Sequence, residues 1–339
     1  MPLSEPSGGI GRKRLLVRNT VFGDGADGAI NFIGADYDSF NDQWLVGGNN
    51  SFVGFQQINR NKVAQSAALP STVITAGNIA DIAFSNIDNG VLVRIGNEYA
   101  RSSDGGATWV DITPAAVVTY RGVLSWKGTQ LLCGAASGTE DIFISTDNGA
   151  TYPNTRDIFS AAVEFFTKDS LDTTFLLGAL NDRVAITQDE DIGTATFITH
   201  DLSATIGFSG NVDTGAIAPG GKEIVVAGDG GDIAVSTDSG VTFTLFPRDD
   251  NPFRNANGVA HEDIEFIEYV PAFSGFMVGG ISVFGFIPGN TDLLSMQPVH
   301  VAAPSNPSYT TSRNSYSATD GTNLVVMTNL NFQFGTVAP

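Results

Sequence analysis

The sequence predicts an all-β protein, and in particular a seven-bladed β-propeller. Two observations lead to this prediction. Short apolar strands recur with a spacing of 38 to 51 residues, and one short turn pattern occurs three times. A repeat of about 40–50 residues built from short strands is typical of four-stranded propeller blades. No segment keeps the apolar spacing of an amphipathic helix for long, so we expect little helix.

Each repeat has an apolar strand, a polar turn and a second strand that ends in glycine or another small residue. The second-strand markers are Val46-Gly47, Ile95-Gly96, Cys133-Gly134, Leu177-Gly178, Ala227-Gly228, Val278-Gly279 and Met327-Thr328. The innermost strands are expected to begin near Ala29, Ala80, Arg121, Ala162, Thr214, Ile264 and Tyr316. Seven markers predict seven blades, and six blades is the alternative.

The last repeat is short for four strands, because it runs only from Tyr316 to about Phe334. A strand near residues 15–17 could supply its missing outer strand. Such a strand would close the ring by joining the first and last blades, which removes exposed sheet edges. We therefore expect a flexible arm over residues 1–14 and a single propeller domain over 15–339.

Three turns share the pattern S-x-D-x-G-x-T-aromatic, at residues 102–109, 145–152 and 236–243. The Asp carboxylate can accept hydrogen bonds from backbone N–H groups of the turn, and Gly supplies a positive φ. Thr starts the returning strand, and the aromatic ring is an apolar anchor. The residues assigned to these structural roles are Ser102, Asp104, Gly106, Thr108, Trp109, Ser145, Asp147, Gly149, Thr151, Tyr152, Ser236, Asp238, Gly240, Thr242 and Phe243.

These turns resemble the Asp-box repeats of sialidases, sortilin-type receptors, the photosystem II assembly propeller and other β-propellers. The resemblance covers about eight residues per repeat and implies a structural turn at the outer rim of a blade, away from the ligand face. The fourth repeat has a degraded copy with an insertion, Thr187-Gln188-Asp189 followed by Gly193 and Thr196-Phe197. The first, sixth and seventh repeats lack the pattern.

Composition limits the possible functions. The chain has 339 residues, 42% of them apolar, and a formal net charge of −19. The apolar content is sufficient for a folded core. The negative charge argues against a general nucleic-acid or anionic-membrane binder, because phosphates would be repelled over most of the surface.

The chain has one cysteine, Cys133, which excludes an intramolecular disulfide framework. It lies in an apolar run, so we expect a buried thiol rather than a nucleophile. The first residues lack the apolar region of a secretory signal, and no uncharged apolar stretch reaches the roughly 20 residues that span a bilayer. We expect a protein made in a cytoplasm, with no membrane insertion.

A basic cluster follows the N-terminal arm in this acidic chain: Arg12, Lys13, Arg14 and Arg18. A solvated terminus is one interpretation. The other is a strap that docks on an acidic neighbour.

In a propeller, the loops that lead into the inner strands form the ligand face around a central channel. The richest local group there is His261-Glu262-Asp263-Ile264-Glu265. The candidate binding residues at this face are Tyr120, Arg121, Asp213, His261, Glu262, Asp263, Arg313 and Tyr316.

A sialidase-like hydrolase, or a glycan-binding Asp-box protein, is the alternative function. Sialidases use three arginines on the substrate carboxylate, a Tyr–Glu pair and an Asp. Candidates for such a set are Arg121, Arg254, Arg313, Tyr316, Glu262 and Asp213. However, the Arg-Ile-Pro motif of that family is absent near the N-terminus, and sialidases have six blades. No catalytic role is therefore assigned to any residue.

Two loops have residues that some metal sites use. The loops 23–28 and 228–232 carry Asp-Gly pairs, as some calcium sites do, but lack the closing Glu of an EF-hand. Turn chemistry also explains such pairs. His261 is the only histidine in an acidic group, and His200 and His300 stand apart, so a zinc site is not expected. We expect no cofactor, with calcium as the open alternative.

The leading interpretation is a non-enzymatic structural or interaction propeller, because no active site is assembled in the sequence. The acidic, cysteine-poor, Gly/Ser/Thr/Asn-rich composition resembles virion proteins of tailed bacteriophages, especially tail and fibre components. This resemblance rests on composition and on no motif. It implies a virion location, other proteins of a larger assembly as partners, and copies arranged in a symmetric ring. Glycan binding is the alternative to a protein partner.

Overall fold

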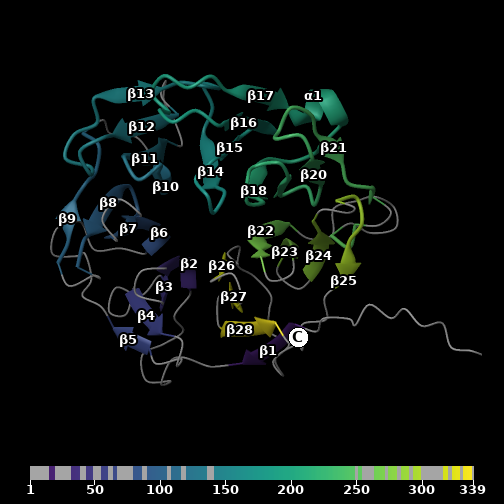
Figure 1. Cartoon of the computed structure of the whole chain (residues 1–339), viewed down its shortest axis with the longest axis horizontal. Helices are drawn as coiled ribbons and strands as arrows, with labels where there is room; N and C mark the ends of the chain where they lie inside the picture. Colours follow the sequence, from purple (N-terminus) through teal and green to yellow (C-terminus); the bar gives the residue numbers. More distant parts are fainter. Residues whose placement is uncertain are drawn as a thin grey trace, which may run out of the picture.

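In the computed structural model, the residues that the structure describes form β-strands, turns and one short helix (Figure 1). The structure describes the backbone of residues 15–19, 32–38, 43–48, 55–59, 64–66, 79–85, 90–104, 108–115, 120–135, 141–248, 251–253, 263–271, 274–280, 284–289, 293–298, 316–319, 323–328 and 331–337. Side chains are described for 81–85, 90–104, 108–115, 122–135, 141–248, 251–253, 263–271, 274–280, 285–289 and 293–296.

The strands of the described residues form four-stranded antiparallel sheets, which we number by their order in the chain. Sheet 1 contains β2 (Phe32–Asp38), β3 (Gln43–Gly48), β4 (Phe55–Asn59) and β5 (Ala64–Ser66). Sheet 2 contains β6 (Ile79–Ser85), β7 (Gly90–Ile95), β8 (Glu98–Ser102) and β9 (Val110–Asp111). Sheet 3 contains β10 (Tyr120–Trp126), β11 (Gln130–Ala135), β12 (Ile142–Ser145) and β13 (Asn154–Arg156).

The next three sheets follow the same order. Sheet 4 contains β14 (Val163–Lys168), β15 (Phe175–Ala179), β16 (Arg183–Thr187) and β17 (Ile198–Asp201). Sheet 5 contains β18 (Val212–Ile217), β19 (Ile224–Gly228), β20 (Ile233–Ser236) and β21 (Thr244–Leu245). Sheet 6 contains β22 (Ile264–Val270), β23 (Gly275–Gly280), β24 (Phe284–Pro288) and β25 (Gln297–Pro298).

Sheet 7 contains strands from both ends of the sequence. It contains β26 (Tyr316–Thr319), β27 (Asn323–Thr328), β28 (Asn331–Val337) and β1 (Leu15–Asn19). β1 pairs antiparallel with β28, with Leu15 opposite Val337 and Arg18 opposite Phe334. The strand predicted near residues 15–17 is therefore present and lies in the last sheet. Arg12, Lys13 and Arg14 of the predicted docking arm lie outside the described residues.

The sheets lie around a common centre, and the first strand of each sheet is the innermost (Figure 1). Each first strand contacts the first strand of the next sheet, and β26 contacts both β22 and β2. The predicted second-strand markers all lie in, or at the end of, the second strand of a sheet. The predicted starts of the first strands are close to the observed ones; the largest difference is in sheet 1, where β2 begins at Phe32.

Because the strands are antiparallel, their two ends form two different sides of each sheet, which we call edges in this sense only. The first and third strands of each sheet end on one side, which carries the S-x-D turns, and we call it the turn edge. The first strands begin at the opposite edge, which we call the mouth edge. The connections between second and third strands and the ends of the fourth strands lie there too.

The hydrophobic core lies between neighbouring sheets. One cluster joins sheets 3 and 4 through Trp126, Leu132, Phe175 and Ala185, and another joins sheets 5 and 6 through Phe246 and other residues. Such burial between faces is the main favourable term in folding. Cys133 is a fully buried free thiol, as predicted, and burial raises the pKa of its thiol to about 12.

The three complete S-x-D turns have the hydrogen bonds that the pattern predicts. In the turn at 145–152, the Asp147 carboxylate accepts bonds from the backbone N–H of Thr151 (2.8 Å) and from the Thr151 hydroxyl (2.6 Å). Asp104 and Asp238 accept the same pair of bonds from Thr108 and Thr242. The first Ser of each pattern also donates to its Asp (2.7–2.8 Å).

The last positions of the pattern are also as expected. Gly149 and Gly240 have φ angles of +87° and +80°. Trp109 and Phe243 are buried, and Tyr152 packs against the cluster between sheets 2 and 3. Gly106 lies outside the described residues.

One element of the described chain was not predicted. The helix α1 (Leu202–Ile206) follows β17; the side chain of Asp201 caps its first turn by accepting from the N–H of Ala204, and Gly207 ends it in the left-handed region (φ +71°). An N-cap Asp followed by a Gly six residues later was the available signal. The helix is too short for an apolar period to show. Among the described residues, no helix is both long enough and apolar enough to cross a membrane.

Candidate functional site

The predicted candidate residues lie at or near the mouth edge, where the structure describes them. Tyr120 and Arg121 are the first two residues of β10, and Tyr316 is the first residue of β26; only their backbone is described. Asp213 is the second residue of β18, and Asp263 directly precedes β22. His261, Glu262 and Arg313 lie outside the described residues, as do Arg254 and His300.

Most first strands carry a β-bulge just after they begin. The register shifts by one residue at the start of β2, β6, β10, β14, β18 and β22. A bulge leaves one residue unpaired and changes the direction of its side chain. In three successive sheets the extra residue is a carboxylate: Glu164 in β14, Asp213 in β18 and Glu265 in β22.

Of these three carboxylates, Asp213 is a predicted candidate and Glu265 belongs to the acidic group 261–265, whereas Glu164 was not predicted. The signal was available, because a β-branched residue followed by an acid begins all three strands: Val163-Glu164, Val212-Asp213 and Ile264-Glu265. It could be recognised only after the three strand starts were aligned with one another.

Asp213 lies among other carboxylates. Burial is the main reason why its pKa is raised from the usual 3.8 to about 7. The negative charges of Asp229, Glu164 and Glu265 raise it further, whereas a hydrogen bond from the backbone N–H of Asp229 lowers it. A carboxyl group in this environment is partly protonated at neutral pH.

A second raised pKa belongs to Asp182, in the turn between β15 and β16. Burial, and then the charges of Asp201 and Asp229, raise the pKa of Asp182 to about 6; a hydrogen bond with Ser203 lowers it, and Asp232 adds to the rise. Asp229 thus acts on both Asp182 and Asp213. We call Glu164, Asp182, Asp213, Asp229 and Glu265 together the acidic mouth.

Hydrogen bonds from residues 209–211 hold the side chains of Asp229 and Asp232 in the loop 228–232. Asp229 accepts from the backbone N–H of Asn211 (2.7 Å) and from its side-chain amide (3.2 Å). Asp232 accepts from the backbone N–H of Ser209 (3.0 Å) and from its hydroxyl (2.9 Å). A Cβ at Gly228 would collide with the carbonyl oxygen of Asn211, so glycine permits this close approach.

These hydrogen bonds give the loop 228–232 a structural role, in line with the turn interpretation of its Asp-Gly pairs. Asp232 also forms an ion pair with Arg248 (2.9 Å). Within the described residues, no group of three or more His, Cys, Asp or Glu side chains is arranged to hold a metal ion. The other calcium candidate, the loop 23–28, lies outside these residues.

Two of the arginines near the mouth edge have structural partners. Arg183 donates to the carbonyl oxygen of Phe159 (3.1 Å), and Arg248 donates to Asp232 and to the carbonyl oxygen of Gly207 (2.9 Å). His200, in contrast, contacts the turn of the next sheet: its Nε2 lies 2.7 Å from the carbonyl oxygen of Gly240, and its ring packs edge-on against Phe243.

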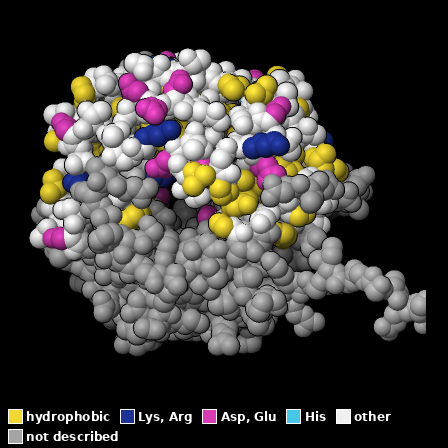
Figure 2. All heavy atoms as spheres, viewed as in Figure 1, with side chains coloured by type: hydrophobic (Ala, Val, Ile, Leu, Met, Phe, Trp, Pro, Cys, Tyr) yellow, Lys and Arg dark blue, Asp and Glu magenta, His cyan; other side chains and the backbone are white. Residues whose placement is uncertain are grey.

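Figure 2 shows that the middle of the face in view is hollowed and that acidic side chains lie beside the hollow, with Lys or Arg side chains on the same face. A hollow between low-dielectric walls with charges of one sign focuses the electrostatic field and attracts groups of the opposite charge. The described part of the site is therefore suited to a cationic ligand.

Solved structures similar to this chain are propellers. Virginiamycin B lyase from Staphylococcus aureus has a TM-score of 0.70 at 12% identity, over 96% of this chain and 100% of the lyase. A catalytically inactive variant of that lyase with quinupristin has a TM-score of 0.68 at 14% identity, over 96% of this chain and 100% of the variant.

The WD40 repeats of RRP9 have a TM-score of 0.67 at 8% identity, over 95% of this chain and 97% of that one. U3-55K has a TM-score of 0.69 at 9% identity, over 95% of this chain and 98% of the U3-55K chain. The fold class is therefore a propeller-type all-β fold. At these identities the similarity defines the fold alone. No protein-family model matches the sequence, and no curated protein matches it significantly.

Proposed function

We propose that this chain is a non-catalytic interaction propeller that binds a cationic segment of a partner protein at its acidic mouth. The observation that carries this proposal is the placement of Glu164, Asp213 and Glu265 at bulges of three successive first strands. A repeat fold that puts the same charge at the same register position in neighbouring blades presents one continuous binding surface.

The raised pKa values of Asp213 and Asp182 support the same proposal. They express the electrostatic cost of holding several carboxylates together in partly buried positions. A lysine or arginine side chain that enters the acidic mouth reduces this cost and gains charge-assisted hydrogen bonds. The binding energy would come from both terms and would decrease with salt concentration.

We also propose the finer fold description, a seven-bladed ring closed by β1 and β28. The pairing of β1 with β28 and the contact of β26 with β2 support it. A place in a larger assembly, such as the virion of a tailed bacteriophage, is the proposed setting, and the composition of the chain supports it. The proposed partner is then a neighbouring protein of that assembly.

The first test is binding of a fluorescein-labelled decalysine peptide, measured by fluorescence anisotropy at low salt. We expect the triple variant Glu164→Gln, Asp213→Asn, Glu265→Gln to bind at least tenfold more weakly than the unchanged protein. A matched control removes three charges outside the acidic mouth: Glu98→Gln in sheet 2, at the same edge, and Asp172→Asn and Glu190→Gln at the turn edge. The control should change affinity less than threefold.

Equal weakening in both triple variants would overturn the proposal, because binding would then depend on net charge alone. The same proteins are also assayed for turnover of sialylated glycans. Turnover that is lost in Arg121→Ala or Arg313→Ala would establish the hydrolase alternative instead.

A further inference from the structure

The degraded fourth copy of the turn pattern, residues 187–197, has kept part of the turn chemistry. Asp189 accepts from the backbone N–H of Thr196 (2.7 Å), as the complete turns do between Asp and Thr. The Thr187 hydroxyl accepts from the backbone N–H of Asp189 (3.1 Å), as the first Ser does elsewhere. Between the Asp and the Thr, the loop is longer by three residues than in the complete turns.

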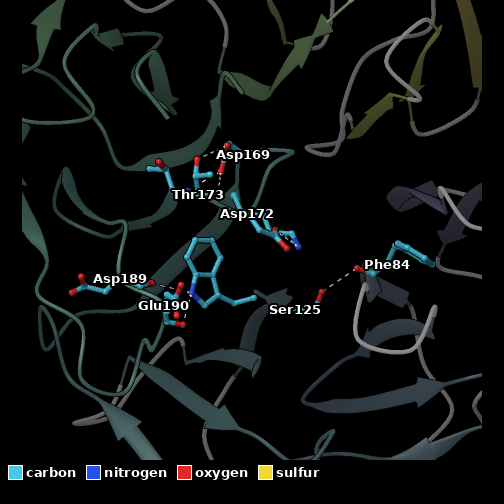
Figure 3. A network of polar contacts seen from close by, with 10 residues as sticks. Phe84, Ser125, Asp169, Asp172, Thr173, Asp189 and Glu190 are labelled. Atoms are coloured by element: carbon cyan, nitrogen blue, oxygen red, sulfur yellow. Dashed lines mark hydrogen bonds and ion pairs between the residues drawn. The ribbon is translucent and has the colours of Figure 1, made fainter. Parts of the chain in front are cut away.

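The longer loop contacts two strands of the preceding sheet. The indole N–H of Trp126, at the end of β10, donates to the carbonyl oxygens of Asp189 (3.3 Å) and Glu190 (3.1 Å) (Figure 3). Gln130, the first residue of β11, makes two hydrogen bonds: it donates to the Asp191 carboxylate (2.6 Å) and accepts from the backbone N–H of Ile192 (3.1 Å). Gln130 is buried, and its bond with the N–H of Ile192 is buried too, whereas the Asp191 carboxylate is exposed.

The loop also fills part of the core and reaches the outermost strand of sheet 3. Ile192 is fully buried in the cluster that contains Trp126, Leu132 and Ile144. Arg156 of β13 donates to the carbonyl oxygens of Gly193 (2.8 Å) and Ala195 (2.9 Å). Its guanidinium group also lies 5.7 Å from the centre of the Phe197 ring, which is a cation–π contact.

The complete turns also contact the preceding sheet, but through fewer groups. The Tyr152 hydroxyl donates to the carbonyl oxygen of Ile112 in the segment after sheet 2 (2.6 Å). The carbonyl oxygen of Gly240 in sheet 5 lies beside His200 of sheet 4. The loop 187–197 contacts three strands of sheet 3 and contributes a buried side chain. The contact between turn and preceding sheet is therefore larger here than in the complete turns.

We propose that the loop 187–197 is a clasp that couples sheets 3 and 4, so that the two sheets unfold locally and refold together. This inference is independent of the acidic mouth, because it concerns the opposite edge of the sheets. Its physical basis is that buried hydrogen bonds are costly to leave unmade. When the clasp detaches, Trp126, Gln130 and the N–H of Ile192 lose their partners together, so the loop and sheet 3 should lose protection at the same time.

The test is amide hydrogen exchange measured by mass spectrometry on the full-length chain. Gln130→Ala should speed exchange at least fivefold both in the peptide that contains 187–197 and in the peptides of β10 and β11. Gln188→Ala is the matched control, because the Gln188 amide donates within its own sheet, to the Thr174 hydroxyl. In this control variant, the exchange rates of β10 and β11 should stay within twofold of those in the unchanged protein.

A second variant keeps the test decisive if Gln130→Ala does not fold. Arg156→Lys keeps the charge but loses the pair of guanidinium hydrogen bonds to the carbonyl oxygens of Gly193 and Ala195. Arg156 lies in the outermost strand of sheet 3. The variant should produce the same joint increase at smaller amplitude. Faster exchange in 187–197 with unchanged β10 and β11 in either variant would overturn the proposal, because the loop would then move without sheet 3.

Discussion

Carboxylates at the two edges of the sheets have opposite properties. At the turn edge, hydrogen bonds from Thr151 and Ser145 lower the pKa of Asp147 to about 2. Asp238 is similar: burial raises its pKa, but hydrogen bonds from Thr242 and Ser236 outweigh that effect, and the net shift is downward. At the mouth edge, burial and neighbouring negative charges raise the pKa of Asp213 to about 7.

The difference shows what each edge does. A carboxylate surrounded by donors is stabilised in its charged form and holds a turn in one conformation. A carboxylate surrounded by other carboxylates is destabilised in its charged form, and a bound cation would stabilise that form. The same residue type thus supports the fold at one edge and carries the proposed binding site at the other. Three variants test this comparison.

The largest effect is expected at a glycine of the turn edge. Gly149 has φ +87°, and a Cβ there would lie 2.6 Å from side-chain atoms of Ile112. Gly149→Ala should therefore lower the free energy of unfolding by about 2–4 kcal/mol, from left-handed strain and overpacking together. Gly128→Ala is the control, because Gly128 has φ +62° and no atom within 4 Å of its added Cβ.

The control should lose only the strain term, about 1–2 kcal/mol. Both variants are compared by urea denaturation. Equal losses would show that the contact with Ile112 does not constrain the turn.

An intermediate effect is expected at Asp213, with the opposite sign. Its pKa is raised in the folded protein, so the fold holds this proton more tightly than the unfolded chain does between pH 4 and about 7. Ionisation therefore destabilises the fold as the pH rises through this range. Asp213→Asn should raise the free energy of unfolding at pH 8 by about 1–2 kcal/mol, after allowance for partial exposure, and change it little near pH 4.

Urea denaturation at pH 4.5 and pH 8 measures this difference. A variant that is less stable than the unchanged protein at pH 8 would contradict the electrostatic account of the acidic mouth.

The smallest effect is expected at Asp238. Asp238→Ala removes the bonds from Thr242 and should cost about 1 kcal/mol at neutral pH. Because the folded pKa of Asp238 is lowered, this contribution is present above about pH 4 and is lost as the pH falls through the folded pKa. The exposed neighbour Thr237→Ala is the control and should be nearly neutral. Thermal melting at pH 7 and pH 3 distinguishes the two variants; an identical loss at both pH values would rule out the carboxylate as the cause.

Much of the fold could be predicted from local patterns. The spacing of the Gly-ended strands located the second strand of every sheet, and the S-x-D patterns located three turns down to their hydrogen bonds. The resemblance to Asp-box repeats remains one of pattern, since the similar solved structures show the propeller fold alone. The helix α1 was missed because five residues are too few to show a helical period.

The acidic mouth was only partly predictable. Asp213 was a predicted candidate because it directly precedes the predicted strand start at Thr214, and Glu265 belonged to the acidic group 261–265. Glu164 lies two residues after the predicted start at Ala162, in no acidic group, and looked like an ordinary strand residue. Its position depends on a bulge, and a bulge is a property of strand pairing rather than of local sequence. The same holds for the clasp: Gln130 and Ile192 are 62 residues apart, and no local pattern indicates that they meet.

The pairing of β1 with β28 has a consequence for the synthesis of the protein. The two strands are about 300 residues apart in the chain, so β1 emerges from the ribosome long before its partner exists. Joining points so far apart costs on the order of 5 kcal/mol of loop-closure entropy if nothing else is folded. That cost falls as the intervening sheets assemble in order and bring the two ends together. Sheet 7 should therefore form last, and a ribosome-stalled chain that lacks β28 should leave β1 open to protease.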